Sequence, residues 1–257
     1  MHINDDGFGA MTRKLERLAT LNEQDRRALS NLPLTRKRVA ARQHLLREGE
    51  DSTTCYVLLS GYACRYKTTS AGARQIVSFH MAGDIVDLQH LLLSRADHSI
   101  QAISDLAFAA TPAAELKKVA QTHPAIAEAL WRDTLIDASV FREWVLNVGR
   151  RDAKQRIAHM LCEFATRRET AGLGRPTSFE LPMTQDDIAD ATGITNVHVN
   201  RVLKDVRRRG LITLQARRLV IHDWPALAAM AGFDPSYLHL EKPPTGSQTS
   251  EGAKDPF

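Results

Sequence analysis

The chain has 257 residues and a formal net charge of +4, with a sequence pI near 9.1. This length allows one large or two ordinary domains, of which two is the better interpretation, and so small a charge excludes a histone-like polycation. The three cysteines are odd in number and lack CxxC spacing, which argues against a disulfide framework and a four-thiolate cluster. No apolar run has membrane-spanning length, and residues 1–11 lack the regions of a signal peptide, so we expect a cytoplasmic protein that does not bind membranes.

Regularly spaced turns mark the front half of the chain. Glycines recur there every eleven or twelve residues, at Gly49, Gly61, Gly72 and Gly83. Strand-like runs such as "CYVLLSGYACRYK" and "RQIVSFHM" lie between them. Many short strands at this spacing are typical of a compact antiparallel barrel or roll. A β-sandwich without ligand function is the alternative that periodicity alone leaves open.

A long helix is predicted from about Pro124 to Gly149. Alternating steps of four and three residues define a candidate coiled-coil seam along it, interrupted by two polar residues. The seam consists of Leu130, Thr134, Asp137, Phe141, Trp144 and Val148. The alternative is an amphipathic helix that packs on its own β domain.

A further helix is predicted from Asp152 to Arg168. Its apolar face consists of Ile157, Met160, Leu161 and Phe164. His159 and Cys162 also lie in this helix. We interpret them as packing or surface residues, because no third metal ligand lies nearby.

The segment "MTQDDIADATGITNVHVNRVLKDVRRRGLI" (183–212) predicts two short helices joined by a turn. Small and apolar residues fall at the packing positions of a DNA-binding helix-turn-helix, namely Ile188, Ala189, Gly193, Ile194, Val199 and Val202. Gly193 lies where the chain must turn, since glycine tolerates positive φ. Thr192 fits poorly, because its position is more often apolar. An ordinary helical hairpin is the alternative.

Helix caps support these two helices. Thr184 and Asp187 are spaced as a capping box for the first helix, and Thr195 or Asn196 can cap the second. The exposed face of the second helix carries amides and an arginine, which can make bidentate contacts to base edges. We therefore prefer the DNA-binding interpretation to the hairpin.

Basic residues follow the second helix. They occur in "VRRRG" (206–210) and "ARRL" (216–219), and beside a helix-turn-helix such runs are suited to phosphate contacts. The stretch "LITLQARRLVIHD" predicts two short strands joined by Ala216, Arg217 and Arg218, which form a wing with a basic tip. The last segment, "EKPPTGSQTSEGAKDPF", has almost nothing to bury and predicts a disordered tail.

The order of these elements resembles the CRP/FNR superfamily of bacterial transcription regulators, over about residues 15–222. The most specific stretches are "LLSGYACRYK", "RRDAKQRIAHMLCEF" and "LPMTQDDIADATGITNVHVNRVLKDVRRRGLI", while "FDPSYLHL" and "NVHVNR" are most similar to a FixK-like branch. The resemblance implies an α+β fold with an N-terminal antiparallel β-roll like a cyclic-nucleotide-binding jelly roll. The implied domains are a roll at 12–122, a dimerisation helix at 123–150, a winged helix-turn-helix at 151–232, and a tail at 233–257, largely disordered from about 241.

The resemblance also locates a candidate effector pocket. In cyclic-AMP-binding members a Gly-Glu and an Arg-Ser pair hold the ribose and cyclic phosphate, and helix residues reach the adenine. The matching positions here are Asp87, Leu88, His98, Ser99, Phe141 and Arg142. Leu88 cannot accept a ribose hydroxyl, Asp87 would repel a phosphate, and His98 lacks the fork of arginine. We therefore do not expect control by cyclic AMP.

Other kinds of sensing have weaker support. The iron-sulfur cluster of oxygen-sensing members is not expected, because no cysteine precedes Cys55. Haem is an alternative, but the histidines of the roll, His80, His90 and His98, have no fixed spacing. Oxidation of Cys64 or Cys162 is a further alternative. We predict no cofactor and no metal site, and the FixK-like resemblance suggests that protein abundance sets activity.

The resemblance places the first residues of the second helix in the major groove of DNA. The base-reading candidates are Asn196, Val197, Asn200 and Arg201. Arg201 would pair with guanine, and the asparagines with adenine. Many members carry glutamate where this chain has Val197, which can only pack on a thymine methyl, so a TTGA-type half-site is not assumed. The phosphate-contact candidates are Thr184, Gln185, Thr195, His198, Lys204, Arg217 and Arg218.

We predict a homodimeric transcription regulator that binds a palindromic operator in double-stranded DNA and recruits or blocks RNA polymerase. The alternative is a ligand-gated sensor whose roll binds haem, a nucleotide or another small effector. An enzyme is not expected, because the chain has no HExxH, GxSxG or Walker-type motif. The identity of any effector stays open.

Overall fold

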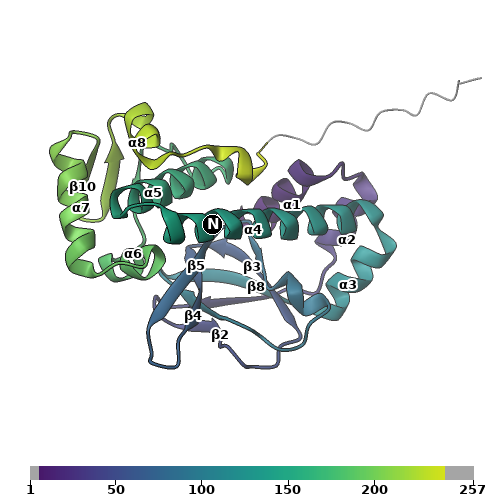
Figure 1. Cartoon of the computed structure of the whole chain (residues 1–257). Coiled ribbons are helices and arrows are strands. Elements are labelled where there is room, and N and C mark those ends of the chain that lie inside the picture. Colours follow the sequence, from purple (N-terminus) through teal and green to yellow (C-terminus); the bar gives the residue numbers. More distant parts are fainter. Residues whose placement is uncertain (1–5, 241–257) are drawn as a thin grey trace, which may run out of the picture.

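The computed structural model describes residues 6–240, and Figure 1 shows a β-roll, a long helix lying along it, and a helical domain at one end. Eight strands between residues 35 and 112 form two antiparallel sheets, in the orders β1-β8-β3-β6 and β2-β7-β4-β5. The strands are β1 (Thr35–Val39), β2 (His44–Leu46), β3 (Thr54–Ser60), β4 (Tyr62–Thr68), β5 (Arg74–Met81), β6 (Ile85–Val86), β7 (Ser99–Ala102) and β8 (Leu106–Pro112). The predicted roll is confirmed.

The strand-like run at residues 55–67 proves to be two strands of different sheets. It divides at Gly61, where φ is +84° and a Cβ atom would collide with the backbone of Asp105. β3 therefore joins the sheet of β1, whereas β4 joins the sheet of β2. Glycine is needed here because this turn has positive φ and another backbone segment lies against it.

Helices close the open side of the roll. They are α1 (Asp6–Leu18), α2 (Glu23–Ser30), α3 (Ala113–Thr122), the 3₁₀ helix η1 (Leu88–Leu91) and α4 (Pro124–Arg150). Met11 and Leu15 of α1 are buried in one cluster with Val57 of the roll and Ile126 of α4. The roll domain therefore includes α1 and begins before residue 12, the start that the sequence predicted.

The last domain follows α4 after a two-residue connection. Its elements are α5 (Ala153–Thr170), β9 (Ser178–Glu180), α6 (Gln185–Thr192), α7 (Asn196–Arg208), β10 (Ile212–Gln215), β11 (Arg218–Ile221), α8 (Trp224–Ala231) and the 3₁₀ helix η2 (Pro235–Leu238). Within residues 178–221, three strands form a sheet in the order β10-β11-β9. The sequence reasoning missed β9, because Phe179 is the only buried residue in this three-residue strand.

The predicted tail begins too early. Residues 233–238 belong to the folded domain, since Leu238 is buried and the hydroxyl of Tyr237 donates a hydrogen bond to Glu163 at 2.7 Å. The part of the tail expected to be disordered from about 241 lies outside the described residues. Within 6–240, no helix is both long and apolar enough to cross a membrane.

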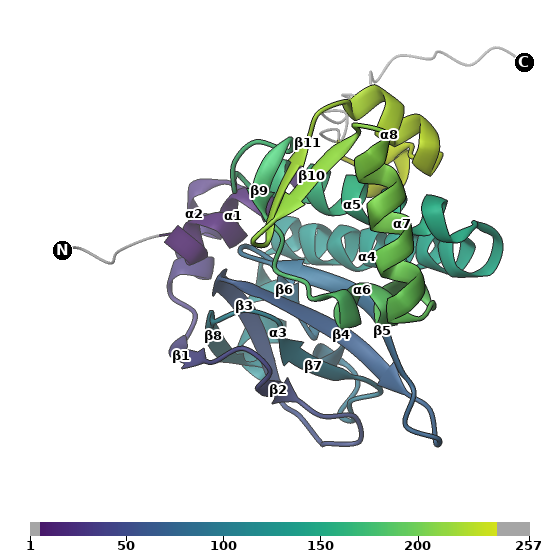
Figure 2. The ribbon, with the colours of Figure 1, turned by 90° about the vertical axis from the view of Figure 1, so that its left-hand side faces the viewer.

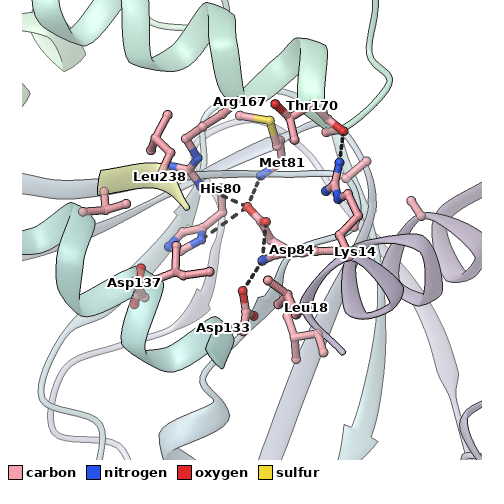
Figure 3. A pocket seen from close by; sticks show the side chains of 18 of the residues that line it. Lys14, Leu18, His80, Met81, Asp84, Asp133, Asp137, Arg167, Thr170 and Leu238 are labelled. Carbon is pink, nitrogen blue, oxygen red and sulfur yellow. Dashed lines mark hydrogen bonds and ion pairs between the residues drawn. The ribbon is translucent and has the colours of Figure 1, made fainter. Parts of the chain in front are cut away.

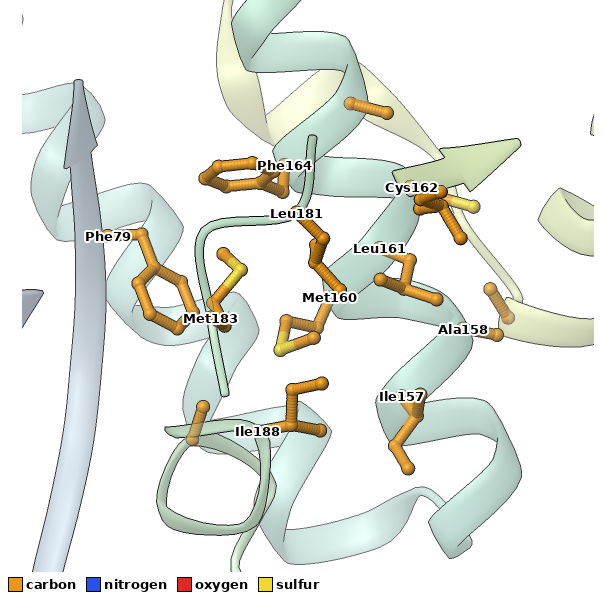
Figure 4. Packing of buried hydrophobic residues seen from close by; sticks show 14 of the residues in the cluster. Phe79, Ile157, Ala158, Met160, Leu161, Cys162, Phe164, Leu181, Met183 and Ile188 are labelled. Atoms are coloured by element: carbon orange, nitrogen blue, oxygen red, sulfur yellow. The ribbon is translucent and has the colours of Figure 1, made fainter. Parts of the chain in front are cut away.

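One hydrophobic cluster joins the roll, α4 and the last domain. Figure 4 shows Phe79 of β5 near Phe164 of α5, and the centroids of these two rings lie 6.1 Å apart. The ring of Phe79 also lies 5.8 Å from that of Trp144, centroid to centroid. Trp144 of α4 belongs to the same cluster, as do Met160 and Ile188 of the last domain. The last domain therefore shares its core with the roll and α4.

Phe164→Ala should lower the free energy of unfolding by about 3–5 kcal/mol, because it leaves a cavity at the centre of this shared cluster. Denaturant unfolding measures the loss. The matched control is Leu92→Ala on the roll, where the side chain is 81% exposed and a change within about 0.5 kcal/mol is expected. Equal losses in the two variants would contradict the central role of Phe164.

Candidate nucleic-acid interface

Local side-chain contacts define the two helices of the helix-turn-helix. The hydroxyl of Thr184 accepts a hydrogen bond from the amide of Asp187 at 3.2 Å, and the Asp187 carboxylate accepts one from the amide of Thr184 at 2.9 Å. This is the predicted capping box of α6. Gly193 ends α6 with a φ of +64°, and Thr195 caps α7 by accepting from the amide of His198 at 3.3 Å. Of the two cap candidates, the structure selects Thr195.

Thr192, the residue that fits the pattern poorly, is fully buried. Its hydroxyl donates a hydrogen bond to the carbonyl oxygen of Ile188 at 2.6 Å, within the same helix. The polar group is thereby satisfied, and threonine can occupy a position that is usually apolar.

The face of α7 that points away from this core is polar and accessible. Val197 is 82% exposed, and Arg201 and Lys204 are also exposed. Within residues 6–240, the side chains of Arg201 and Lys204 make no hydrogen bond or ion pair, so their charges are available for a ligand. Asn200 donates a weak hydrogen bond to Gln185 at 3.4 Å, and Asn196 donates one to Asp186.

Some basic residues in the "VRRRG" run, at the end of α7, form ion pairs within the protein. Asp205 lies 2.7 Å from the ammonium of Lys154 on α5, 2.8 Å from the guanidinium of Arg208 and 3.2 Å from that of Arg209. The hydrogen bonds from Lys154 and Arg208 lower the pKa of Asp205 to about 2. Two arginines of the "VRRRG" run are therefore paired with Asp205 at the end of α7, and the contact with α5 is made by Lys154.

The wing is present, but its turn is shorter than predicted. Ala216 and Arg217 both have positive φ and form a two-residue hairpin turn, so Arg218 already lies in β11. Arg217 donates to the carbonyl oxygen of Pro182 at 2.6 Å, and Arg218 donates to the hydroxyl of Ser178 at 3.1 Å. Each guanidinium has five donors, so both retain donors for another ligand.

The exposed apolar stripe of α4 shares only Phe141 with the predicted seam. Its members are Trp131 (74% exposed), Leu135 (66%), Phe141 (51%), Val145 (55%) and Leu146 (45%). The seam prediction is wrong for Leu130 and Trp144, which are buried in the chain's own core, and Asp137 forms an ion pair with Arg65 of the roll at 2.7 Å. Of the predicted seam, Thr134 and Phe141 are exposed and Val148 is half-buried.

Comparison with known proteins decides the family. Residues 155–230 match the Crp-like helix-turn-helix domain, and residues 36–123 match the cyclic nucleotide-binding domain. The chain belongs to the CRP/FNR family. It is a DNA-binding transcription regulator, and the family consists of regulators rather than enzymes.

Relatives of this CRP/FNR regulator match over most of their length. The anaerobic regulatory protein of Haemophilus influenzae is 26% identical over 223 residues, which cover 87% of this chain and 86% of that protein. The fumarate and nitrate reduction regulatory protein of Escherichia coli is 25% identical over 213 residues, or 83% and 85%. The structure of FixK2 from Bradyrhizobium japonicum superposes with a TM-score of 0.73 at 26% identity, covering 79% of this chain and 100% of that one. This likeness supports the FixK-like branch.

Two of the predicted effector residues of the regulator are already paired with each other. A carboxylate oxygen of Asp87 lies 2.9 Å from Nε2 of His98, whose Nδ1 lies 2.7 Å from Asp97. Both Asp87 and His98 are buried. Ser99 is also engaged, because its hydroxyl accepts from the amide of Glu48 at 2.9 Å. The positions that match the cyclic-phosphate contacts are thus closed by the roll's own side chains.

A cavity of about 520 Å³ lies between α1, the roll, α4 and the end of α5 (Figure 3). Only Asp87 and Leu88 of the predicted effector residues line it. Phe141 and Arg142 are exposed, and the α4 residues that face the cavity include Asp133 and Asp137. The cavity therefore coincides with the predicted effector residues only at Asp87 and Leu88.

Ion pairs line this cavity. The ammonium of Lys14 lies 2.9 Å from Asp84 and 2.7 Å from Asp133, and Arg167 lies 3.3 Å from Asp84 (Figure 3). Burial opposes ionisation of Asp84, but Lys14, His80 and Arg167 outweigh it and hold its pKa well below the ordinary value. These charges therefore satisfy one another.

The thiols of the regulator lie in the core. Cys64 and Cys162 are fully buried, and burial raises their pKa values to about 11 and about 12. A thiol in this environment is protonated near neutral pH and poorly reactive. Their burial speaks against oxidation of either residue as the switch.

The histidines of the roll are also engaged. His80 lies 2.9 Å from the hydroxyl of Ser78, and Nδ1 of His90 lies 3.3 Å from the carbonyl oxygen of Thr54. His98 lies between Asp87 and Asp97. In the described part of the chain, no group of three or more His, Cys, Asp or Glu side chains is arranged to hold a metal ion.

Arg201→Ala should cost about 1–3 kcal/mol of operator binding and relax the preference at one base pair, because a bidentate contact to guanine is lost. Binding of the purified variant to the operator and to its single-base variants measures both effects. Lys204→Ala is the matched control on the same helix, and it should weaken all sequences alike. An unchanged base preference in the Arg201 variant would exclude base reading by this residue.

Proposed function

We propose that this regulator acts as a homodimer on a palindromic operator in bacterial cytoplasm, where it recruits or blocks RNA polymerase. One observation carries the proposal. The first turns of α7 pack on one face through Val199 and Val202 and expose Val197 and Arg201 on the other. A recognition helix requires this division between a packed face and a reading face.

The exposed side chains suggest what each half-site contains. Arg201 has an uncommitted guanidinium for guanine O6 and N7, and Asn196 and Asn200 have amides for adenine. Their present bonds, to Asp186 and Gln185, are exposed side-chain contacts that a base can replace. Val197 offers only apolar contact, which suits a thymine methyl. The proposed half-site therefore contains a guanine, an adenine and a thymine in neighbouring positions.

Phosphate contacts would flank this base-reading group. The exposed candidates are Gln185, Thr195, Lys204, Arg217 and Arg218. His198 is half-buried, and the hydroxyl of Thr184 is already bonded to Arg42 and Asp187, which makes Thr184 the weakest of the predicted contacts. Because these groups contact backbone oxygens, they would set position and affinity rather than base preference.

The apolar stripe of α4 supports the dimer. Five large hydrophobic side chains of one helix are 45–74% exposed in the single chain, whereas surface hydrophobics usually occur singly. The steps from Trp131 to Leu135 and on to Val145 continue with a heptad-like period along the helix. A second copy packed on this stripe would bring two α7 helices into one assembly, as a palindrome requires.

We also propose that DNA binding does not need cyclic AMP. The pair formed by Asp87 and His98 supports this, because it occupies the positions that match the phosphate contacts of cyclic-AMP-binding members. The ligand-gated alternative is favoured by a different observation, the cavity of about 520 Å³ between α1 and α4.

Selection of sites from random double-stranded DNA by the ligand-free protein, at fixed salt, separates these two functions. We expect a strong palindromic consensus, because the reading face of α7 is already exposed. Weak, salt-sensitive binding without a consensus would contradict the proposal and favour gating by a ligand.

Leu135→Glu should convert the dimer to a monomer and weaken operator binding about 100-fold, because it places a charge in the proposed interface and removes bivalent binding. Sedimentation velocity and operator titration measure the two effects. The matched control is Leu92→Glu, since Leu92 is also an exposed leucine, at 81% against 66% for Leu135, but lies on the roll. If the Leu135 variant stayed dimeric and bound normally, α4 would not be the interface.

A further inference from the structure

Two arginines of the roll contact the first residues of α6. The guanidinium of Arg42 donates to the carboxylate of Asp187 at 2.8 and 3.1 Å and to the hydroxyl of Thr184 at 3.0 Å. Arg74 lies 3.3 Å from Asp187 and 3.3 Å from Asp190. We name these contacts of Arg42 and Arg74 with Asp187 the roll clamp. Figure 2 shows α6 beside β5, the strand on which Arg74 lies.

The backbone of Arg42 is held in one conformation by the roll. Its φ is +73°, a left-handed value that side chains other than glycine adopt rarely. The amide of Arg42 donates to the carbonyl oxygen of Ala102 at 2.7 Å, and its own carbonyl oxygen accepts from the side chain of Gln101 at 2.9 Å. Such strain persists where surrounding contacts enforce it, and it often marks a functional position.

Arg74 is equally restrained. Its guanidinium donates to Sγ of Cys64 and to the side chain of Gln101, both at 3.0 Å, and stacks over the ring of Tyr66 at 4.5 Å. The adjacent Gln75 donates to the carbonyl oxygen of Ala191 in α6 at 3.2 Å. The roll therefore presents a rigid set of donors to α6.

Asp187 receives these donors at the start of α6. Its side chain is completely buried, and the same carboxylate closes the capping box with Thr184. Burial alone would raise its pKa, but the hydrogen bonds from Thr184 and Arg42 lower it, so the carboxylate is ionised near neutral pH. If α6 moved away from the arginines, this buried carboxylate would keep an uncompensated charge. The contact therefore favours the one arrangement in which Asp187 faces the arginines.

We propose that the roll clamp positions α6, and through it α7, for DNA reading. The proposal rests on the DNA-reading role of α7. Only the turn at Gly193 separates the two helices, so a rotation of α6 would move α7 with it. With the clamp closed, Val197 on α7 remains 82% exposed, and the docked arrangement is compatible with DNA binding. Arg42 and Arg74 are thus positioning residues, and the roll controls the DNA-binding domain through Asp187.

Three single variants test the clamp by operator titration at fixed salt. Arg42→Ala, Arg74→Ala and Asp187→Asn should each weaken operator binding about tenfold, a typical size for coupling between sites. Asparagine at 187 can still accept the capping hydrogen bond from Thr184. The matched control is Arg36→Ala, an exposed arginine on β1 of the same roll, which should leave binding within about twofold.

The double variant Arg42→Ala/Asp187→Asn distinguishes positioning from direct contact with DNA. If Arg42 acts through Asp187, the double variant should bind no more weakly than Asp187→Asn alone. Additive losses, with a salt slope reduced by about one in the Arg42 variant, would show that Arg42 contacts a phosphate and would overturn the proposal.

A measurement without DNA keeps the clamp separate from the proposed function. Spin labels at Ser70→Cys on the roll and Gln215→Cys on the wing report the distance between the two domains, since both sites are exposed. We expect a narrow distance distribution in the otherwise native protein and a broadened one with Asp187→Asn. An unchanged distribution in that variant would overturn the clamp, whereas failure of the native chain to bind any operator would overturn the DNA-reading role instead.

Discussion

The contact on which the rest of the structure depends is the hydrophobic cluster that joins β5, α4 and α5. Phe79, Trp144 and Phe164 meet there, and the helix-turn-helix packs on the same core through Met183 and Ile188. Because apolar burial is the dominant favourable contribution to folding, this cluster makes the roll, α4 and the DNA-binding domain one packed unit. A change in one of these elements must therefore be accommodated by the others.

Ion pairs determine which residues of these elements face each other, which apolar contact alone does not. Hydrophobic contact has no direction, whereas an ion pair defines which groups face each other. Lys14 connects α1 with the roll and α4, Arg65 connects the roll with α4, and Lys154 connects α5 with α7. Several basic side chains are thus committed to internal ion pairs, whereas Arg201 and Lys204 are among those left without one in the described residues.

Much of the candidate site could be predicted from the sequence, because its determinants are local. The capping box of Thr184, the turn at Gly193 and the exposed residues from Asn196 to Arg201 depend on neighbours within four residues of each other. The wrong predictions concern which side of a helix packs on the roll and which distant residues pair with each other. The predicted seam on α4 includes Leu130 and Trp144, which pack in the chain's own core, because both sides of this helix carry apolar residues and periodicity cannot show which side packs on the roll.

The sequence by itself determined the family, the order of the elements and the exposed polar face of α7, because spacing along one helix is set by covalent geometry. Only the tertiary structure decided that Asp87 pairs with His98, that Asp133 and Asp137 face the cavity, and that Arg42 reaches Asp187. The last two residues are 145 positions apart. Contacts of this kind depend on how distant segments pack together, and no local pattern records them.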